Sequence, residues 1–134
     1  MKLDGLIMPV DLSWVIPSRV VHIHIYDDMP LDLFRVLANQ TTEYIEAGVA
    51  PVHFLLDDKD ADPPPVNIKL LANAYGVTEK DITSVGWVIG VGKPHAIAKI
   101  VVPLFMNVLK VKFLRVDTTE EAIAFLKKQD STLV

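Results

Sequence analysis

The sequence predicts an α/β fold: a single mixed, mostly parallel sheet of about five strands, with an N-terminal antiparallel hairpin and about four helices. Two observations support this fold class. The chain opens with two β-rich runs separated by a short turn, as in a hairpin. After them, apolar runs of strand length alternate with segments whose apolar residues recur at helical spacing. Because helices between successive strands make right-handed crossovers, the later strands should lie parallel.

The N-terminal half supplies the hairpin, one long helix and a strand in the middle of the sheet. Ser13 to Pro17 and Arg19 to Tyr26 are the hairpin strands. Apolar residues recur at helical spacing from Pro30 to Ala47, and Gly48 follows as a helix stop. Pro51 to Asp57 is a short apolar run ending in carboxylates, which is typical of a buried strand whose end meets solvent.

The C-terminal half continues the alternation of helices and strands. Thr118 and Glu121 have the spacing of a capping box, which predicts the start of the last helix. Before it we expect a short helix at Val66 to Tyr75, a strand at Thr83 to Val91, an apolar helix at Pro94 to Leu109 and a strand at Val111 to Val116. These elements should form one domain at residues 13–134, preceded by a loose arm at residues 1–12.

Composition excludes several function classes. The 134 residues include no cysteine, which rules out disulfides, thiolate nucleophiles and cysteine-ligated metal sites. No stretch has the roughly 20 uninterrupted apolar residues of a membrane-spanning helix, and the first residues lack the apolar core of a secretory signal. We therefore expect a cytoplasmic protein, with peripheral membrane attachment as an alternative. The net charge of −4 argues against nucleic-acid binding.

The apolar helix is the main functional clue. Its polar residues fall in one narrow stripe, and nearly everything else around it is apolar, whereas a helix that covers a sheet usually keeps a wide polar face. The helix therefore has more apolar surface than contact with the sheet alone needs. This surface could be covered by a neighbouring helix, a second copy of the chain, a lipophilic ligand or a membrane surface. The candidate binding residues are Lys93, Ile97, Lys99, Ile100, Val101, Val102, Leu104, Phe105, Met106 and Val108.

We expect this helix to divide its apolar residues between the sheet and another surface. The residues expected to line the sheet, at i, i+4 spacing, are Ile97, Val101, Phe105 and Leu109. Those expected to contact a neighbouring helix or to form an exposed patch are Ile100, Val102, Leu104, Met106 and Val108. The helix is also bordered by lysines, which suit an anionic lipid or partner, although solvated helix ends have the same composition.

A loop rich in aspartate is the second candidate surface, and its acidic residues are Asp57, Asp58, Asp60 and Asp62. Carboxylates are suitable ligands for calcium or magnesium. An EF-hand loop, however, would need Gly in place of Pro63 and Glu in place of Lys69. The loop is therefore interpreted as solvated or as an acidic patch that faces a partner, and we expect no metal.

Two further motifs have a structural interpretation beside a functional one. Gly90 to Lys93 lacks the full Walker and dinucleotide patterns, which leaves a tight turn or a weak anion site. His22, His24 and His53 are half-exposed sheet residues or the members of a three-histidine site. The sequence assembles no nucleophile, acid–base pair or cofactor motif, so we predict no enzyme activity and no cofactor.

Four segments have the pattern of a known family: Trp14 to Ile23, Pro51 to Asp57, Gly86 to Gly92 and Phe113 to Ala122. On these segments, from about Ser13 to Gln129, the chain resembles the SpoIIAA-like family, relatives of the STAS anti-sigma-factor antagonists. The fold of that family is also related to the CRAL-TRIO lipid-binding domains. The resemblance implies a fold and a regulatory role, and none of the four segments is a catalytic signature.

The chain departs from the resemblance at one place. In the phosphorylation-switched antagonists, a Ser or Thr shortly after the terminal Asp of the central strand receives phosphate. Here Asp57 is followed by Asp58, Lys59 and Asp60, and the next Ser or Thr in the chain is Thr78. The switch residue is missing, so the resemblance implies protein binding without a phosphorylation switch.

Two functional hypotheses follow. The first is a non-enzymatic binding module that recognises a lipophilic small molecule, a membrane surface or a protein partner through the helix at 94–109, where a homodimer is a further candidate. The alternative is a constitutive STAS-like regulator that binds a kinase-like or sigma-related protein without phosphorylation.

Overall fold

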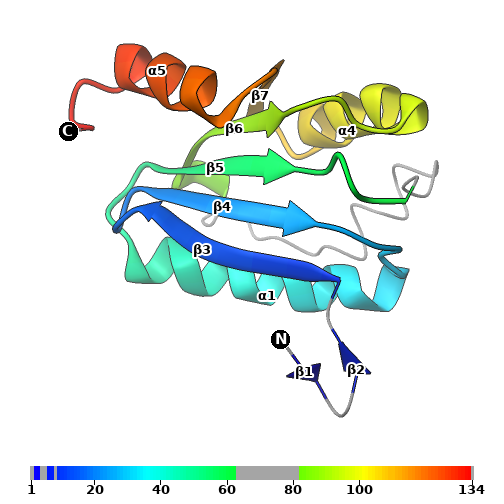
Figure 1. Ribbon diagram of the computed structural model, residues 1–134. Coiled ribbons are helices and arrows are strands. Elements are labelled where there is room, and N and C mark those ends of the chain that lie inside the picture. The colour runs from blue at the N-terminus through cyan, green and yellow to red at the C-terminus, as the bar shows by residue number, and fades with distance from the viewer. Residues whose placement is uncertain (1, 4–5, 8, 63–81, 134) are drawn as a thin grey trace.

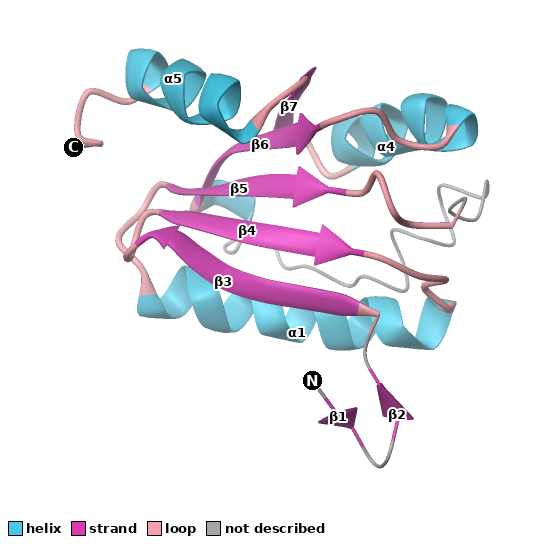
Figure 2. Cartoon of the chain, in the orientation of Figure 1, coloured by secondary structure: helices cyan, strands magenta, loops and turns pink. Residues whose placement is uncertain are grey.

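The computed structural model of the protein describes residues 2–3, 6–7, 9–62 and 82–133 (Figure 1). The strands are β1 (Lys2–Leu3), β2 (Leu6–Ile7), β3 (Val10–Ile16), β4 (Val20–Ile25), β5 (Val52–Asp57), β6 (Val85–Val91) and β7 (Lys112–Val116). The helices among the described residues are α1 (Leu31–Ala47), α4 (Ala96–Val108) and α5 (Thr119–Gln129). Figure 2 shows these helices packed around one central sheet.

Five strands form a single mixed sheet in the order β3-β4-β5-β6-β7. β3 and β4 are the antiparallel hairpin, and β4 to β7 run parallel to one another. Helix α1 connects β4 to β5 and helix α4 connects β6 to β7, since parallel neighbours need such crossovers. β1 and β2 form a separate antiparallel pair. The predicted mixed sheet with an N-terminal hairpin is confirmed.

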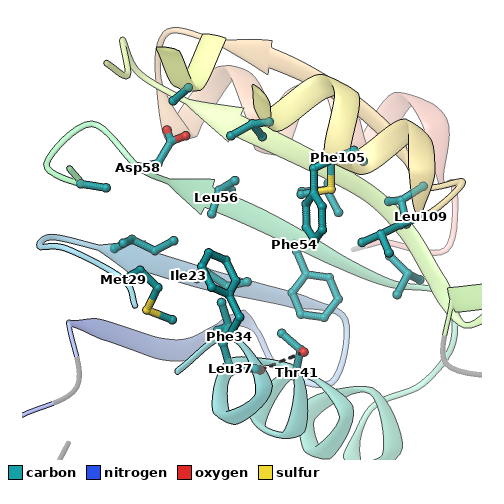
Figure 3. Close-up of a pocket in the computed structure, with 18 of the residues that line it drawn as sticks. Ile23, Met29, Phe34, Leu37, Thr41, Phe54, Leu56, Asp58, Phe105 and Leu109 are labelled. Carbon is teal, nitrogen blue, oxygen red and sulfur yellow. Dashed lines mark hydrogen bonds between the residues drawn. The ribbon is translucent and has the colours of Figure 1, made fainter. Parts of the chain in front are cut away.

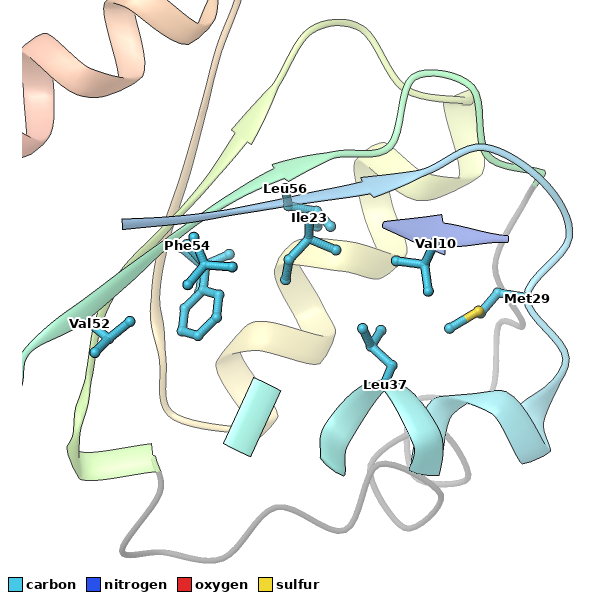
Figure 4. Close-up of a cluster of buried hydrophobic side chains, with 9 residues drawn as sticks. Val10, Ile23, Met29, Leu37, Val52, Phe54 and Leu56 are labelled. Carbon is cyan, nitrogen blue, oxygen red and sulfur yellow. The ribbon is translucent and has the colours of Figure 1, made fainter. Parts of the chain in front are cut away.

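The burial of each strand follows from its place in the sheet. β5 is buried at all six positions because it is the central strand and both of its faces are covered. One face packs against α1 and α4 through a core that includes Ile23, Leu37 and Phe54 (Figure 4). The opposite face packs against α5 through a core that includes Leu55 and Leu126. α5 contacts β5, β6 and β7, so it covers the half of the sheet farthest from the hairpin.

The boundaries of several elements differ from those expected. β3 begins at Val10, whose side chain is buried in the core, so residues 10–12 belong to the sheet rather than to an arm. The predicted helix at residues 66–75 lies outside the described residues. The described residues contain three helices, compared with about four expected for the whole chain. Thr118 is confirmed as the start of α5, because its hydroxyl accepts a hydrogen bond of 3.1 Å from the Glu121 N–H. No described helix is long and apolar enough to span a membrane.

A buried polar cluster lies at the amino edge, where the parallel strands begin. The His53 ring is 2% exposed, and its Nδ1 accepts a hydrogen bond of 2.9 Å from the Trp87 N–H. Nε2 must therefore carry the proton, which it donates to the Asp130 carboxylate at 2.9 Å. Arg19 adds an ion pair to Asp130 at 2.6 Å. These bonds hold the segment after α5, residues 130–133, against the sheet.

The charge of Asp130 is strongly favoured in this cluster. Hydrogen bonds from Thr132 and then from His53 are the main causes that hold the pKa of Asp130 far below its ordinary value, and Arg19 lowers the pKa further. The cluster also explains Gly86. A Cβ atom at this position would lie 2.3 Å from Nδ1 and Cε1 of His53, so the imidazole fits only against a residue without a side chain.

Candidate functional site

The outer face of α4 carries a row of apolar side chains, which we call the α4 stripe. It consists of Ile97, Ile100, Leu104 and Val108, whose side chains are 38%, 66%, 50% and 52% exposed. Spacings of three, four and four residues keep them on one side of the helix. The predicted surplus of apolar surface on this helix is therefore present, and these four side chains make up the part that solvent reaches.

The inner face of α4 differs from the expected arrangement. Ala98 and Val101 are buried, and Val102 and Met106 pack against the core. Ile97 was expected against the sheet but is exposed. Val102 and Met106, which were expected to contact a neighbouring helix or to form an exposed patch, pack against the core that includes Leu37 of α1. The reason is geometric: each step from i to i+4 advances about 40° around the helix, so Ile97 lies about 120° from Leu109 at the other end of the row.

An apolar cavity of ≈150 Å³ lies between the inner face of α4, helix α1 and the sheet (Figure 3). Ile23, Phe34, Phe54 and Phe105 are among its lining residues. The Thr41 hydroxyl in the lining is already bonded to carbonyl groups of its own helix. Asp58 also contributes to the lining, and its carboxylate is held by an ion pair described below. The cavity therefore offers mainly apolar contacts.

A polar cluster lies at the carboxyl edge, where β4 and β5 end. Lys59 donates two hydrogen bonds to the Asp57 carboxylate at 2.8 and 2.9 Å, and Nε2 of His22 lies 3.7 Å from the same carboxylate. Nε2 of His24 lies 3.0 Å from an oxygen of Asp60. The hydrogen bond with Asp57 raises the pKa of Lys59, while partial burial lowers the pKa of His22 in spite of the nearby Asp57.

Asp58 and Arg115 form a bidentate ion pair that joins the end of β5 to β7. The two guanidinium nitrogens lie 2.8 and 3.0 Å from the two carboxylate oxygens, and the Asp58 side chain is buried. Gly90 on the intervening strand β6 makes room for this pair, because a Cβ atom there would lie 2.8 Å from the Arg115 guanidinium carbon. The pair holds the start of the acidic loop, residues 57–62, at the carboxyl edge of the sheet.

The structure divides the predicted acidic patch into two parts. Asp57 and Asp58 are buried and paired with cations, whereas Asp60 and Asp62 are exposed. Only Asp60 and Asp62 could present carboxylates to a partner. Loop residues 57–62 thus form a short acidic segment held at its base by two ion pairs and open at its tip.

The three predicted histidines are not brought together. The ring centroids of His22 and His24 are 6.3 Å apart at the carboxyl edge, whereas His53 lies in the cluster at the amino edge. Across the described residues, no three histidine, aspartate or glutamate side chains converge as metal ligands would. In the segment from Gly90 to Lys93, Gly92 makes a turn with a φ of +85°, and the His95 side chain caps the N-terminus of α4 through the Ile97 N–H.

Sequence reasoning missed the pairing of Asp58 with Arg115 and of Asp130 with His53. A signal existed for the first pair, because Arg115 lies between the apolar strand residues Leu114 and Val116, where a charge that is largely buried needs a partner. The second pair joins residues 77 positions apart, and only the folded chain brings them together.

Comparison with known proteins identifies the fold. The chain is similar to a solved structure of the anti-sigma factor antagonist SpoIIAA in its unphosphorylated form, with a TM-score of 0.61 over 89% of this chain and 96% of that chain. The two sequences are 13% identical, so the similarity concerns the fold. The SpoIIAA-like fold predicted from the sequence is confirmed, whereas the relation to CRAL-TRIO domains stays a prediction. No family model and no curated protein matches the chain.

Proposed function

We propose that this chain is a regulatory, non-enzymatic module that binds a protein partner without being switched by phosphorylation. The observation that carries the proposal is the SpoIIAA-like fold, which extends over 89% of the chain and belongs to a protein described as an anti-sigma factor antagonist. This similarity favours the protein-binding hypothesis over the lipophilic ligand or membrane surface that the sequence placed first.

The acidic loop supports the absence of a phosphorylation switch. Residues 57–62 contain no Ser or Thr. Counted from Asp57, the expected switch position is near Lys59 or, one residue later, at Asp60. Asp60 is 51% exposed and already carries a negative charge, which no kinase needs to add. The ion pairs of Asp57 with Lys59 and of Asp58 with Arg115 hold the loop in one arrangement. A partner would therefore meet an acidic loop whether or not a kinase is present.

Calorimetric titration tests the proposal with purified kinase-like and sigma-related regulatory proteins from the same organism. The wild-type chain should bind one of them with and without ATP, and its intact mass should not increase by a phosphate group. Asp60→Ala should weaken this binding, because it removes one of the two exposed carboxylates of the loop. The matched control is Glu43→Ala, which removes an exposed carboxylate from α1 and should leave the affinity unchanged.

Three results would count against the proposal. One is the absence of binding to every such protein. A second is binding that requires ATP and is accompanied by phosphate on the chain. A third is equal loss of affinity in Asp60→Ala and Glu43→Ala, which would point to a general effect of net charge rather than to the loop.

A second candidate function is the binding of a small apolar molecule, and the cavity between α1 and α4 favours it. Cavities of about this size lined by apolar side chains bind molecules such as benzene or xenon. Native mass spectrometry of the freshly purified chain, followed by organic extraction, tests this candidate. A bound apolar compound that is lost in Phe105→Ala would support it, whereas a bare chain would leave protein binding as the sole proposal.

A further inference from the structure

We infer that the α4 stripe is the docking surface for an acidic amphipathic helix of the protein partner. The inference rests on the proposed function and adds the surface and the chemistry of the partner segment. Six large apolar side chains among the described residues are exposed, and four of them form the stripe. The other two, Val15 and Val49, lie elsewhere in the chain. Exposed apolar surface concentrated in this way is typical of an interaction site.

The charged residues in the chain segment that contains the stripe are all of one sign. From Ile82 to Val116 the chain contains no Asp or Glu, while its cations are Lys93, Lys99, Lys110, Lys112 and Arg115. Arg115 is bound to Asp58, and the Lys112 ammonium lies 5.7 Å from the centroid of the Trp87 ring. Within the described part of the chain, no carboxylate forms an ion pair with Lys93, Lys99 or Lys110. Carboxylates on a partner would complement these three ammonium groups.

The same charges argue against a second copy of this chain as the occupant. If two stripes packed against each other, two copies of a segment whose charged residues are all cations would be brought close together. No carboxylate in residues 82–116 could pair with them, so like charges would meet at the edge of the contact. A different protein with carboxylates beside its apolar residues avoids this repulsion.

The composition of the stripe favours a helix over a lipid surface. Helices that lie in a membrane interface commonly insert aromatic residues, but the stripe has only aliphatic side chains, and Phe105 lines the cavity instead. Aliphatic side chains at spacings of three and four residues form a ridge that fits the groove of a second helix. The complementary partner is a helix with apolar residues at i, i+3, i+4 and i+7 and with Asp or Glu beside them.

The test uses the full ¹⁵N-labelled chain and two blocked peptides of about 18 residues, long enough to form helix on binding. Both have Leu on one face, and the other face is Glu in one peptide and Lys in the other. The Glu peptide should shift the resonances of residues 97–108 and should bind more weakly as salt is added. The Lys peptide should bind at least about tenfold more weakly.

Three variants make the test specific. Ile100→Gln with Leu104→Gln should weaken binding of the Glu peptide about tenfold or more, because it removes apolar contacts without changing the charge. The matched control, Val15→Gln with Val49→Gln, changes exposed apolar residues outside the stripe and should bind like the wild type. Lys93→Glu with Lys99→Glu should reverse the preference in favour of the Lys peptide.

Several results would overturn the inference. They are equal binding of the two peptides, equal losses in the stripe variant and its control, or a stripe-dependent dimer or stripe-dependent binding to phosphatidylserine vesicles without peptide binding. The proposed function can fail separately. If a regulatory partner binds the wild type and the stripe variant equally, α4 is not the docking surface although the proposed function stands. If the Glu peptide binds as expected but no regulatory protein does, the docking surface stands and the proposed function fails.

Discussion

Asp130 shows how one side chain can fasten a terminal segment to a sheet. Its carboxylate accepts bonds from Thr132, His53 and Arg19, and the segment after α5 has few other polar anchors among the described residues. Asp130→Asn should lower the free energy of unfolding by roughly 2 kcal/mol at neutral pH, since hydrogen bonds to a charged group are lost. Chemical denaturation measures this change, and Glu43→Gln is the control at an exposed carboxylate.

The effect of Asp130 should depend on pH in a defined direction. Folding lowers the pKa of Asp130, so the carboxylate stabilises the fold above its ordinary pKa of 3.8, and this contribution is lost as the pH falls below that value. The difference in stability between the wild type and Asp130→Asn should therefore shrink on acidification below about pH 4. A difference that stays constant down to pH 2 would show that the charge of Asp130 is not the source of the stability.

Gly86 is the second residue whose role depends on the same cluster. Gly86→Ala should destabilise the fold by about 3 kcal/mol or more, because the new methyl group would collide with the His53 ring. In a chain that already carries His53→Ala, the same substitution should cost far less, since the ring is gone. Denaturation of the two single variants and the double variant tests this coupling. Additive losses would mean that the close approach to His53 is not the cause.

Single residues were the least predictable part of the site. The sequence indicated that Asp57, Asp58, Asp60 and Asp62 gather in one loop, but it could not indicate which of them are neutralised. That depends on Arg115, which lies 57 positions from Asp58 and reaches it across the glycine of a neighbouring strand. Such pairings depend on strand order, which local patterns do not specify.

Among the elements, α4 was predicted well in extent, and in orientation it departs from the prediction at Ile97, which is exposed. Its expected range was 94–109 and its observed range is Ala96–Val108. The apolar surplus was visible in the sequence because so few polar residues interrupt it. Which side chains remain exposed depends on the rotation of the helix against the sheet, and that rotation is set by the packing of Ala98, Val101, Val102 and Met106.

Pro103 gives α4 an internal defect. A proline inside a helix lacks the N–H that would bond to the preceding turn, which costs about 3 kcal/mol relative to alanine in a helix interior. Pro103→Ala should therefore raise the free energy of unfolding, by an amount no larger than that value. Thermal and chemical denaturation measure the change, and a destabilised variant would contradict this role. Because Pro103 is exposed and outside the stripe, peptide binding should be retained.

For the whole molecule, the alternation of strands and helices was sufficient to predict the sheet. A largely apolar run at residues 52–56 indicated the central strand, and the short turn after Ile16 indicated the hairpin. Right-handed crossovers then leave few possible orders for the strands in the sheet. The similarity to SpoIIAA agrees with the observed fold. The sequence could not choose between protein binding and ligand binding, because an apolar helix serves either purpose until its exposed face and its neighbours are known.

The claim that the chain binds a protein without a phosphorylation switch has one direct test. Amide hydrogen exchange should be measured on the chain alone, with a purified kinase-like regulatory partner, and with that partner and ATP. We predict slower exchange in α4 and in residues 57–62 when the partner is added, and the same pattern when ATP is present. Protection that appears or disappears only with ATP, or no protection at either segment, would contradict the account.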